Sequence, residues 1–396
     1  MVPKLRQQFN ANFSPEKYRA FLKGMDDACG THIKFRNSET PCFYPKSLLE
    51  RMAQYGGELV HQLLDNPDYR AASGQSIPPE FNVPRETAHP EFIQVDFGLV
   101  RDEAGELEPK LVEIQGFPSL YGYQTVLAQQ CIRAYQLDER LKFTLGGLDL
   151  DSYTQLLRRA VVGEHDPESV VLMEIDPQEQ KTLPDFLATE RLCGITTVNA
   201  ADVMKEGNRL FYLRNGQKSL IRRIYNRVIA DELLRKNKRL PFSFRDDLEV
   251  EWAGHPNWFF RISKFSIPYL HHRCVPKTCF LHEADPLPDD LENYVLKPLY
   301  SFAGVGVIIG PTREDLAAIP LERRSEYILQ ERLDFEPVIE TPHGPTKAEI
   351  RIMYIWVDTL RPGPILVRMG RGTMMGVDYN RNMEWVGSSA GLFLNE

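Results

Sequence analysis

The sequence predicts a mixed fold, part α/β and part α+β, built from two or three units. The chain has 396 residues, of which 42% are hydrophobic and 26% are charged, and this is typical of a globular protein with several domains. Strand and helix patterns alternate in its middle part, which is typical of a parallel sheet. Beyond about residue 256 most segments are strands joined by short turns, which indicates an antiparallel sheet with helices. We divide the chain into regions 1–150, 151–255 and 256–396.

Charge and cysteine usage limit the classes of partner. The formal net charge of −8 argues against nucleic acid or an anionic membrane as the main partner. Arginines nevertheless cluster at 222–227 and at 368–371, and such clusters suit a small anion such as a nucleotide phosphate. The six cysteines form no CxxC, and no stretch has the apolar length of a secretory signal or a membrane span. We therefore expect a cytoplasmic protein with small-molecule partners, while the formation of a homo-oligomer is left open.

The first region combines helices with one pair of strands. Ser14 marks a helix start, and apolar residues at helical spacing continue to about residue 70. A strand over 92–100, a turn and a second strand over 110–115 follow, and a helix over 123–137 comes next.

The second region alternates strands and helices. A strand over 170–175, a helix over 181–192 and a strand over 194–203 predict a parallel unit that binds ligands at the carboxyl ends of its strands. Residues 209–216 and 217–228 predict a further pair of strands. In the third region we expect strands over 294–299, 305–310, 327–333, 348–357 and 365–372.

Two neighbouring strands of the first region carry side chains with oxygen atoms. Asp96 lies in one strand, and Glu113 and Gln115 lie two residues apart in the other, so these two share a face of the sheet. Carboxylate and amide oxygens are ligands that Mg²⁺ takes in proteins. An exposed strand face with scattered acids is the alternative, because the pattern D…E-x-Q is short.

The stretch from Lys297 to Gly306 has the chemistry of phosphate binding. The lysine ends an apolar strand, and a turn with Ser301, Ala303 and Gly304 follows. Glycines let backbone N–H groups approach phosphate oxygens, and the lysine adds a positive charge. The stretch matches neither the Walker loop nor GxGxxG. A tight hairpin with an exposed lysine is the alternative.

Later strands add a candidate hinge and two arginines. The backbone of the strand that ends at Gln330 and Glu331 is suited to contact the edge of an adenine while a carboxylate binds the ribose, although an ordinary charged turn fits as well. Arg351 and Arg368 lie in strands, where an arginine clamps a phosphate or carboxylate or else forms a cross-strand ion pair.

The order of these segments resembles the nucleotide half of the ATP-grasp superfamily. Lysine, glycine turn, hinge and arginine follow one another, whereas Asp96…Glu113-Ile-Gln115, which is similar to the family's metal-binding D…E-x-N, precedes them. This rotated order resembles the circularly permuted branch of the superfamily, which includes glutathionylspermidine-synthase-like proteins.

Four stretches carry the resemblance to this branch. Residues 112–123 resemble its E-D-N-x-R-x-P-S-G-x-S-Y signature, and residues 221–231 resemble its I-x-R-R-x-D-D stretch. Ser263-Lys264 is similar to the D-K pair that precedes the nucleotide-binding lobe, and residues 367–391 are similar to the closing R-V-A…S-S-Q-G-G segment. The chain departs from the pattern at Gln115, where the family usually has Asn.

The resemblance implies a circularly permuted ATP-grasp fold with a Rossmann-like pre-ATP-grasp domain, and ATP and Mg²⁺ as cofactors. Region 1–150 would supply a helical part and the metal-binding strands, region 151–255 the substrate domain, and region 256–396 the nucleotide-binding lobe and the rest of the core. The implied roles are phosphate binding by Lys264, Lys297 and the turn of Ser301, Ala303, Gly304 and Gly306; adenine and ribose binding by Gln330, Glu331, Leu333 and Glu336; Mg²⁺ coordination by Asp96, Glu113 and Gln115; γ-phosphate neutralisation by Arg351 and Arg368; and substrate binding by Arg223 and Arg227.

The reaction that the resemblance implies is a carboxylate–amine ligation in two steps. ATP phosphorylates an amino acid, a peptide or a similar small carboxylate to an acylphosphate, and an amine then displaces the phosphate. Positioning and charge neutralisation account for most of the catalysis of such a phosphoryl transfer. A small-molecule kinase and a non-catalytic nucleotide-binding protein are the alternatives.

Overall fold

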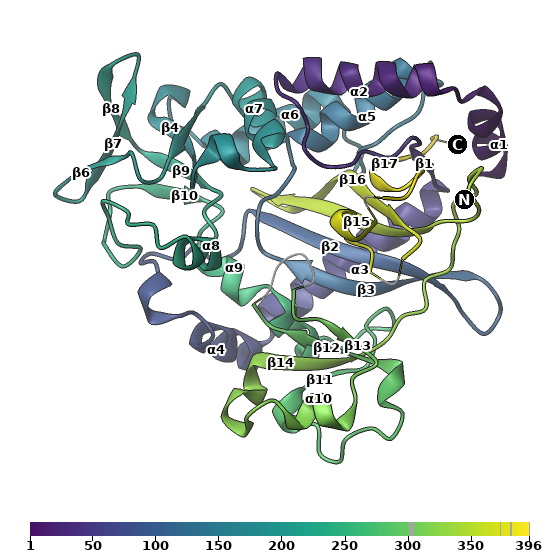
Figure 1. The fold of residues 1–396 in the computed structure, drawn as a ribbon. Helices are drawn as coiled ribbons and strands as arrows, with labels where there is room; N and C mark the ends of the chain where they lie inside the picture. Colours follow the sequence, from purple (N-terminus) through teal and green to yellow (C-terminus); the bar gives the residue numbers. More distant parts are fainter. Residues whose placement is uncertain (301–304, 373, 381, 396) are drawn as a thin grey trace.

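The computed structural model describes residues 1–300, 305–372, 374–380 and 382–395 (Figure 1). Its helices are α1 (Pro3–Asn12), α2 (Pro15–Cys29), α3 (Lys46–Asp65), α4 (Pro67–Gln75), α5 (Tyr123–Ala134), α6 (Leu150–Val162), α7 (Leu183–Cys193), α8 (Ala230–Arg235), α9 (Asn257–Arg261), α10 (Arg313–Ala317) and the 3-10 helix η4 (Lys264–Tyr269). Its strands are β1 (Cys42–Phe43), β2 (Phe92–Arg101), β3 (Leu107–Gln115), β4 (Val170–Glu174), β5 (Thr196–Asn199), β6 (Met204–Glu206), β7 (Arg209–Arg214), β8 (Gln217–Ile221), β9 (Arg223–Asn226), β10 (Glu251–Ala253), β11 (Thr278–Phe280), β12 (Tyr294–Pro298), β13 (Ile308–Ile309), β14 (Tyr327–Glu331), β15 (Lys347–Trp356), β16 (Leu360–Gly370) and β17 (Gly387–Leu392).

The helical prediction for the first region is confirmed by α2, α3 and α4. The Ser14 side chain accepts a hydrogen bond from the backbone N–H of Lys17, so it caps α2 as expected. The predicted helix after the two strands is α5. None of the helices in the described ranges combines the length and the apolar character needed to cross a bilayer.

The central sheet joins the first region to the end of the chain. Its order is β1-β17-β16-β15-β2-β3, so the strands β15, β16 and β17 join the β2–β3 hairpin through the pairing of β15 with β2 (Figure 1). The sequence predicts β2, β3, β15 and β16, which are confirmed as antiparallel pairs, whereas β1 and β17 were not predicted. The third predicted region is therefore shared between two sheets, since its first strands form the separate sheet β11-β14-β12-β13.

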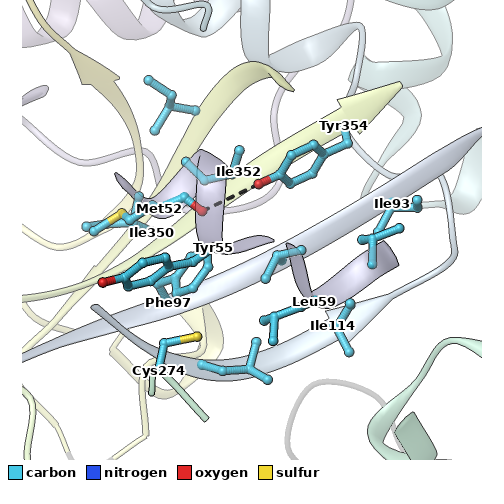
Figure 2. Packing of buried hydrophobic residues seen from close by; sticks show 14 of the residues in the cluster. Met52, Tyr55, Leu59, Ile93, Phe97, Ile114, Cys274, Ile350, Ile352 and Tyr354 are labelled. Atoms are coloured by element: carbon cyan, nitrogen blue, oxygen red, sulfur yellow. Dashed lines mark hydrogen bonds between the residues drawn. The ribbon is translucent and has the colours of Figure 1, made fainter. Parts of the chain in front are cut away.

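One face of the central sheet is apolar and packs on α3. Figure 2 shows Ile93 and Phe97 of β2 and Ile350 and Ile352 of β15 facing the helix. The hydroxyl of Tyr354 donates to backbone carbonyls of α3, including that of Ala53 at 2.8 Å. A Cβ atom at Gly56 would collide with that hydroxyl, so the close approach of helix and strand requires glycine here. Burial of this apolar face fixes which face of the sheet is left for polar residues.

A β-bulge in β3 sets the orientation of Glu113. Asp96 pairs with Glu113 in the register, but the next residue, Phe97, pairs with Leu111, so Val112 is the extra residue. Leu111 and Ile114 are fully buried in the apolar core. Because the bulge interrupts the alternation of side chains, Glu113 lies on the opposite face from Leu111 although the two are only two residues apart.

The second region contains the predicted parallel unit. Its sheet has the order β10-β9-β4-β5 and all its pairs are parallel, with α7 connecting β4 to β5. The predicted strand over 217–228 is wrong in one respect, because the chain leaves the β7–β8 hairpin after Ile221 and residues 223–226 join the parallel sheet as β9. The predicted strand over 305–310 is also too long, since Ile308 and Ile309 alone of its described residues pair, as β13.

Candidate functional site

The second face of the central sheet changes from apolar to charged along its strands. Phe92, Met353 and Leu366 lie in the apolar cluster shared with α6 and β4. Farther along β2, β15 and β16 this face carries polar side chains, because the register sets Arg351 opposite Asp96, and Glu349 opposite Arg368. Side chains from β3, η4, β12 and β14 approach it from the edge. We call the following residues the charged cluster: Gln94, Asp96, Glu113, Gln115, Lys264, Lys297, Gln330, Glu349, Arg351 and Arg368.

Asp96 lies between two arginines. Its Oδ1 atom accepts from Arg351 Nε at 2.5 Å, and its Oδ2 atom accepts from Arg351 Nη2 at 2.7 Å and from Arg368 Nη2 at 2.5 Å. Burial alone would raise the pKa of this carboxyl group, but the positive charges of Arg351 and Arg368 outweigh it and lower the pKa below its ordinary value. The carboxylate is therefore ionised and holds both guanidinium groups.

Each of these arginines has a second partner. Arg351 Nη1 donates to Gln94 Oε1 at 2.6 Å, and Gln94 Nε2 donates to the carbonyl of Ser119 at 2.5 Å. Arg368 forms an ion pair with Glu349. Burial raises the pKa of Glu349 to about 7, so this carboxylate takes up a proton near neutral pH.

The lysines meet Glu113 at the edge of the sheet. Lys264 Nζ lies 3.1 Å from Glu113 Oε1, and Gln115 Nε2 donates to Glu113 Oε2 at 2.9 Å. Lys297 Nζ donates to Gln330 Oε1 and, at 3.3 Å, to the carbonyl of Val112, the extra residue of the bulge. The structure thus brings together the acidic residues predicted near residue 100 and the lysines predicted near 264 and 297.

Electrostatics at this edge favour an anion. Burial lowers the pKa of Lys297 to about 8, and the positive charge of Lys264 adds to this lowering, while Glu113 opposes it. Burial would raise the pKa of Glu113, but Lys264 lowers it overall. The charged cluster holds four cationic side chains and three carboxylates, and a bound phosphate would offset the surplus of positive charge.

Three buried polar atoms at the cluster have no hydrogen-bond partner within the described ranges. They are Arg368 Nε, Gln330 Nε2 and Ser388 Oγ, and Ser388 is the register partner of Arg368 on β17. Buried donors without partners are costly in a folded protein. They therefore mark positions where a ligand would supply acceptors.

The predicted hinge lies partly within the cluster. Gln330 points toward Lys297, whereas Glu331 is exposed and its backbone N–H donates to the carbonyl of Lys277 at 2.8 Å. Leu333 is half-buried. The carboxylate of Glu336 pairs with Arg101 of β2 at 2.9 Å, so a role of Glu336 at a ribose would require it to leave that partner.

The predicted phosphate turn is described in part. Ser301, Ala303 and Gly304 lie outside the described residues. Gly306 has a φ of +74°, and a Cβ atom there would lie 2.9 Å from Pro298 Cγ, so the turn requires glycine at this position.

The two arginines predicted to bind substrate are held by other contacts. Arg223 donates to the carbonyls of Ala160 and Val161 at the end of α6 and pairs with Glu251 at 2.8 Å, so its guanidinium is directed to the α/β unit rather than to the cluster. The role of Arg223 on the acceptor side therefore stays a prediction that these contacts do not support.

Arg227 lies beyond the carboxyl end of β9 and is only 3% exposed. It pairs with Asp185 at 2.5 Å, and its guanidinium lies over the rings of Phe117 and Phe186. Asp185 also accepts from the backbone N–H groups of residues 120, 122 and 123. This pair therefore ties the loop after β3 to α7, and a structural role accounts for all these contacts.

Sequence reasoning missed Gln94 as a member of the site, and it placed Glu349 on the strand face of Arg351 without giving it a role. Glu349 lies two residues before Arg351, so the alternation of a strand already placed both side chains on one face. Gln94 likewise lies two residues before Asp96 on β2, so both side chains are on one face. The contribution of the Val112 carbonyl depends on the bulge, for which the sequence gives no signal.

Comparison with known proteins gives a likeness of fold. No family model matches the chain, and no curated protein matches it. Among solved structures it is similar to a glutathione synthetase-like effector from Globodera pallida in its apo form, with a TM-score of 0.58, 11% sequence identity, and coverage of 96% of this chain and 99% of that chain. The permuted order and a Rossmann-like substrate domain stay predictions. The chain therefore has a mixed α+β fold that is similar to the fold of this glutathione synthetase-like effector.

Proposed function

We propose that this chain binds ATP and Mg²⁺ and ligates a small carboxylate to an amine through an acylphosphate. The observation that carries the proposal is the meeting of Lys264 and Lys297 with Glu113 beside Arg351 and Arg368, because these side chains come from distant segments and converge on one face. The fold likeness to a glutathione synthetase-like protein supports the same class of reaction.

The cationic side chains would perform most of the work in phosphoryl transfer. Lys264 and Lys297 lie at the sheet edge, where they would bind phosphate oxygens. Arg351 lies on β15, next to β2, and Arg368 lies on β16, the following strand. Both would neutralise charge on the phosphoryl group as it moves. Gln94, Asp96 and Glu349 hold these arginines before any ligand arrives, so little reorganisation is needed.

The residues predicted for Mg²⁺ fit it in part. Glu113 and Gln115 lie next to each other on the polar face and carry the oxygen atoms that Mg²⁺ takes. Within the described ranges, no group of three or more His, Cys, Asp or Glu side chains is arranged to hold a metal ion. The cation would therefore be held by Glu113 and Gln115 together with phosphate and water, and it would supply charge neutralisation at the phosphates.

The test is an ADP-release screen of the whole protein. Amino acids, short peptides and polyamines are offered singly and in pairs, with ATP and MgCl₂. A ligase releases ADP when an acid and an amine are both present, and mass spectrometry finds the amide. ADP release with an acid alone, and a phosphorylated product, would instead show a kinase. No ADP release and no ATP binding would refute the proposal.

A further inference from the structure

Asp96 has little capacity left to bind a metal. Oδ2 accepts from two guanidinium groups and Oδ1 from a third N–H, and the side chain is 1% exposed. A direct bond to a cation would require at least one oxygen to leave an arginine. That arginine would then remain buried without its charge partner, which is unfavourable.

Asp96 also contacts both arginines at once. Arg351 is held between Asp96 and Gln94, and Arg368 is held between Asp96 and Glu349. The bidentate contact with Arg351 fixes the plane of that guanidinium as well as its position. The shared carboxylate therefore sets the spacing of the two cations on neighbouring strands.

Glu113 differs from Asp96 in its surroundings. Its side chain is 24% exposed, and its partners are Lys264 and the amide of Gln115. It lies at the edge of the sheet, beside the lysines that would bind phosphate. A hydrated cation has room to reach this carboxylate without breaking a buried arginine pair.

From this contrast we infer that Asp96 is a positioning residue for Arg351 and Arg368, and that Glu113 with Gln115 holds the divalent cation. The inference rests on the proposed function, since it concerns the same site. It departs from the sequence-based assignment of Asp96 as a metal ligand.

The test compares ATP binding with and without metal by titration calorimetry of the whole protein. Removing a carboxylate that acts only as a metal ligand would strengthen the binding of metal-free ATP, because a negative charge near the phosphates is lost. Removing a positioning carboxylate weakens it. We expect Asp96→Asn to weaken the binding of metal-free ATP, measured in EDTA, at least about tenfold. The ratio of the affinities for ATP with and without Mn²⁺ should stay within about threefold of the wild-type ratio. Glu113→Gln should reduce that ratio about tenfold or more without weakening metal-free binding.

The opposite pattern overturns the inference: tighter binding of metal-free ATP by Asp96→Asn together with a lost effect of Mn²⁺. If Asp96→Asn does not fold, Arg351→Lys replaces it, since lysine keeps the charge but loses the bidentate contact; unchanged affinity for metal-free ATP would then overturn the inference. A wild-type protein that binds no ATP refutes the proposed function, and inorganic tripolyphosphate then serves as the probe for the same comparison. Lack of binding to both probes overturns both claims.

Discussion

The Nζ atom of Lys264 lies 3.1 Å from the carboxylate of Glu113, and this ion pair joins η4 to the edge strand of the central sheet. The two residues come from different predicted regions of the chain. Their contact makes Glu113 the residue at which the lysines reach the polar face of the sheet.

Replacing Glu113 by alanine should abolish Mg²⁺-dependent ATP hydrolysis. The variant removes a predicted ligand of the cation and the ion pair with Lys264, and we expect a loss of about 100-fold or more in rate. The measurement is phosphate release at saturating MgCl₂. Glu106→Ala, at the exposed turn between the same strands, is the matched control and should keep the wild-type rate. Equal rates for both variants would remove Glu113 from the mechanism.

The affinity for ATP should fall as the pH rises above about 8. The pKa of Lys297 is lowered to about 8, mainly by burial, with Lys264 adding to the effect and Glu113 and Glu349 opposing it. Because the protonated lysine binds phosphate, the dissociation constant should rise by up to about tenfold per pH unit above that value. Lys297→Arg stays charged and should give a flat profile between pH 7 and 9. A wild-type profile as flat as that of the arginine variant would contradict the prediction.

The same shift affects stability in a defined direction. The folded pKa of Lys297 lies below the value of 10.5 for a free lysine, so the unfolded chain binds a proton between pH 8 and 10.5 that the folded chain has lost. The contribution of Lys297 to stability therefore rises with pH across this window. Urea unfolding of the wild type and of Lys297→Met at pH 8 and pH 10 measures this contribution. The free energy of unfolding of the wild type should rise relative to that of the variant between the two pH values.

Replacing Gly98 by alanine should destabilise the fold by about 1–3 kcal/mol. Gly98 lies on the polar face of β2, opposite Glu349, and a Cβ atom there would overlap the ring of Phe335. The strand and the segment around Phe335 would have to separate. Gly57→Ala in α3, where a Cβ atom meets nothing within 4 Å, is the control and should stabilise by about 0.5–1 kcal/mol. Similar unfolding midpoints in urea for both variants would show that the segment around Phe335 can move away from Gly98 with little loss of stability.

Replacing Arg227 by methionine should destabilise the protein by about 3 kcal/mol. The substitution leaves Asp185 buried without its charge partner and loosens the loop after β3. The exposed pair of Arg140 and Asp138 offers the control, and Arg140→Met should leave the unfolding midpoint unchanged. Normal stability of Arg227→Met with reduced turnover would instead restore the substrate-binding role predicted from the sequence.

Local patterns account for most of what the sequence predicts correctly. The β2–β3 hairpin, the parallel unit and the strand pair of β15 and β16 each follow from periodicity within one segment. The pairing of β15 with β2 depends on contacts between the two ends of the chain, and no local pattern encodes it. The resemblance to a permuted family implies one site for Asp96, Glu113 and Lys297, but it does not predict this pairing of strands.

The roles of single arginines were harder to predict than the strands that carry them. Arg351 and Arg368 have the same kind of sequence context as Arg223, yet they point into the cluster while Arg223 binds α6 and Glu251. What separates them is the tertiary partner that each side chain meets. Such partners follow from packing of whole elements and are absent from the local sequence.

The bulge at Val112 makes the site sensitive to the number of residues in β3 as well as to their identity. Deletion of Val112 would restore regular alternation with Leu111 and Glu113 as direct neighbours, so the Glu113 side chain would keep its place on the polar face. The deletion would remove the backbone carbonyl that accepts from Lys297. A library of variants should therefore tolerate many substitutions at position 112 but lose affinity for ATP when this residue is deleted, because its backbone, rather than its side chain, holds the lysine.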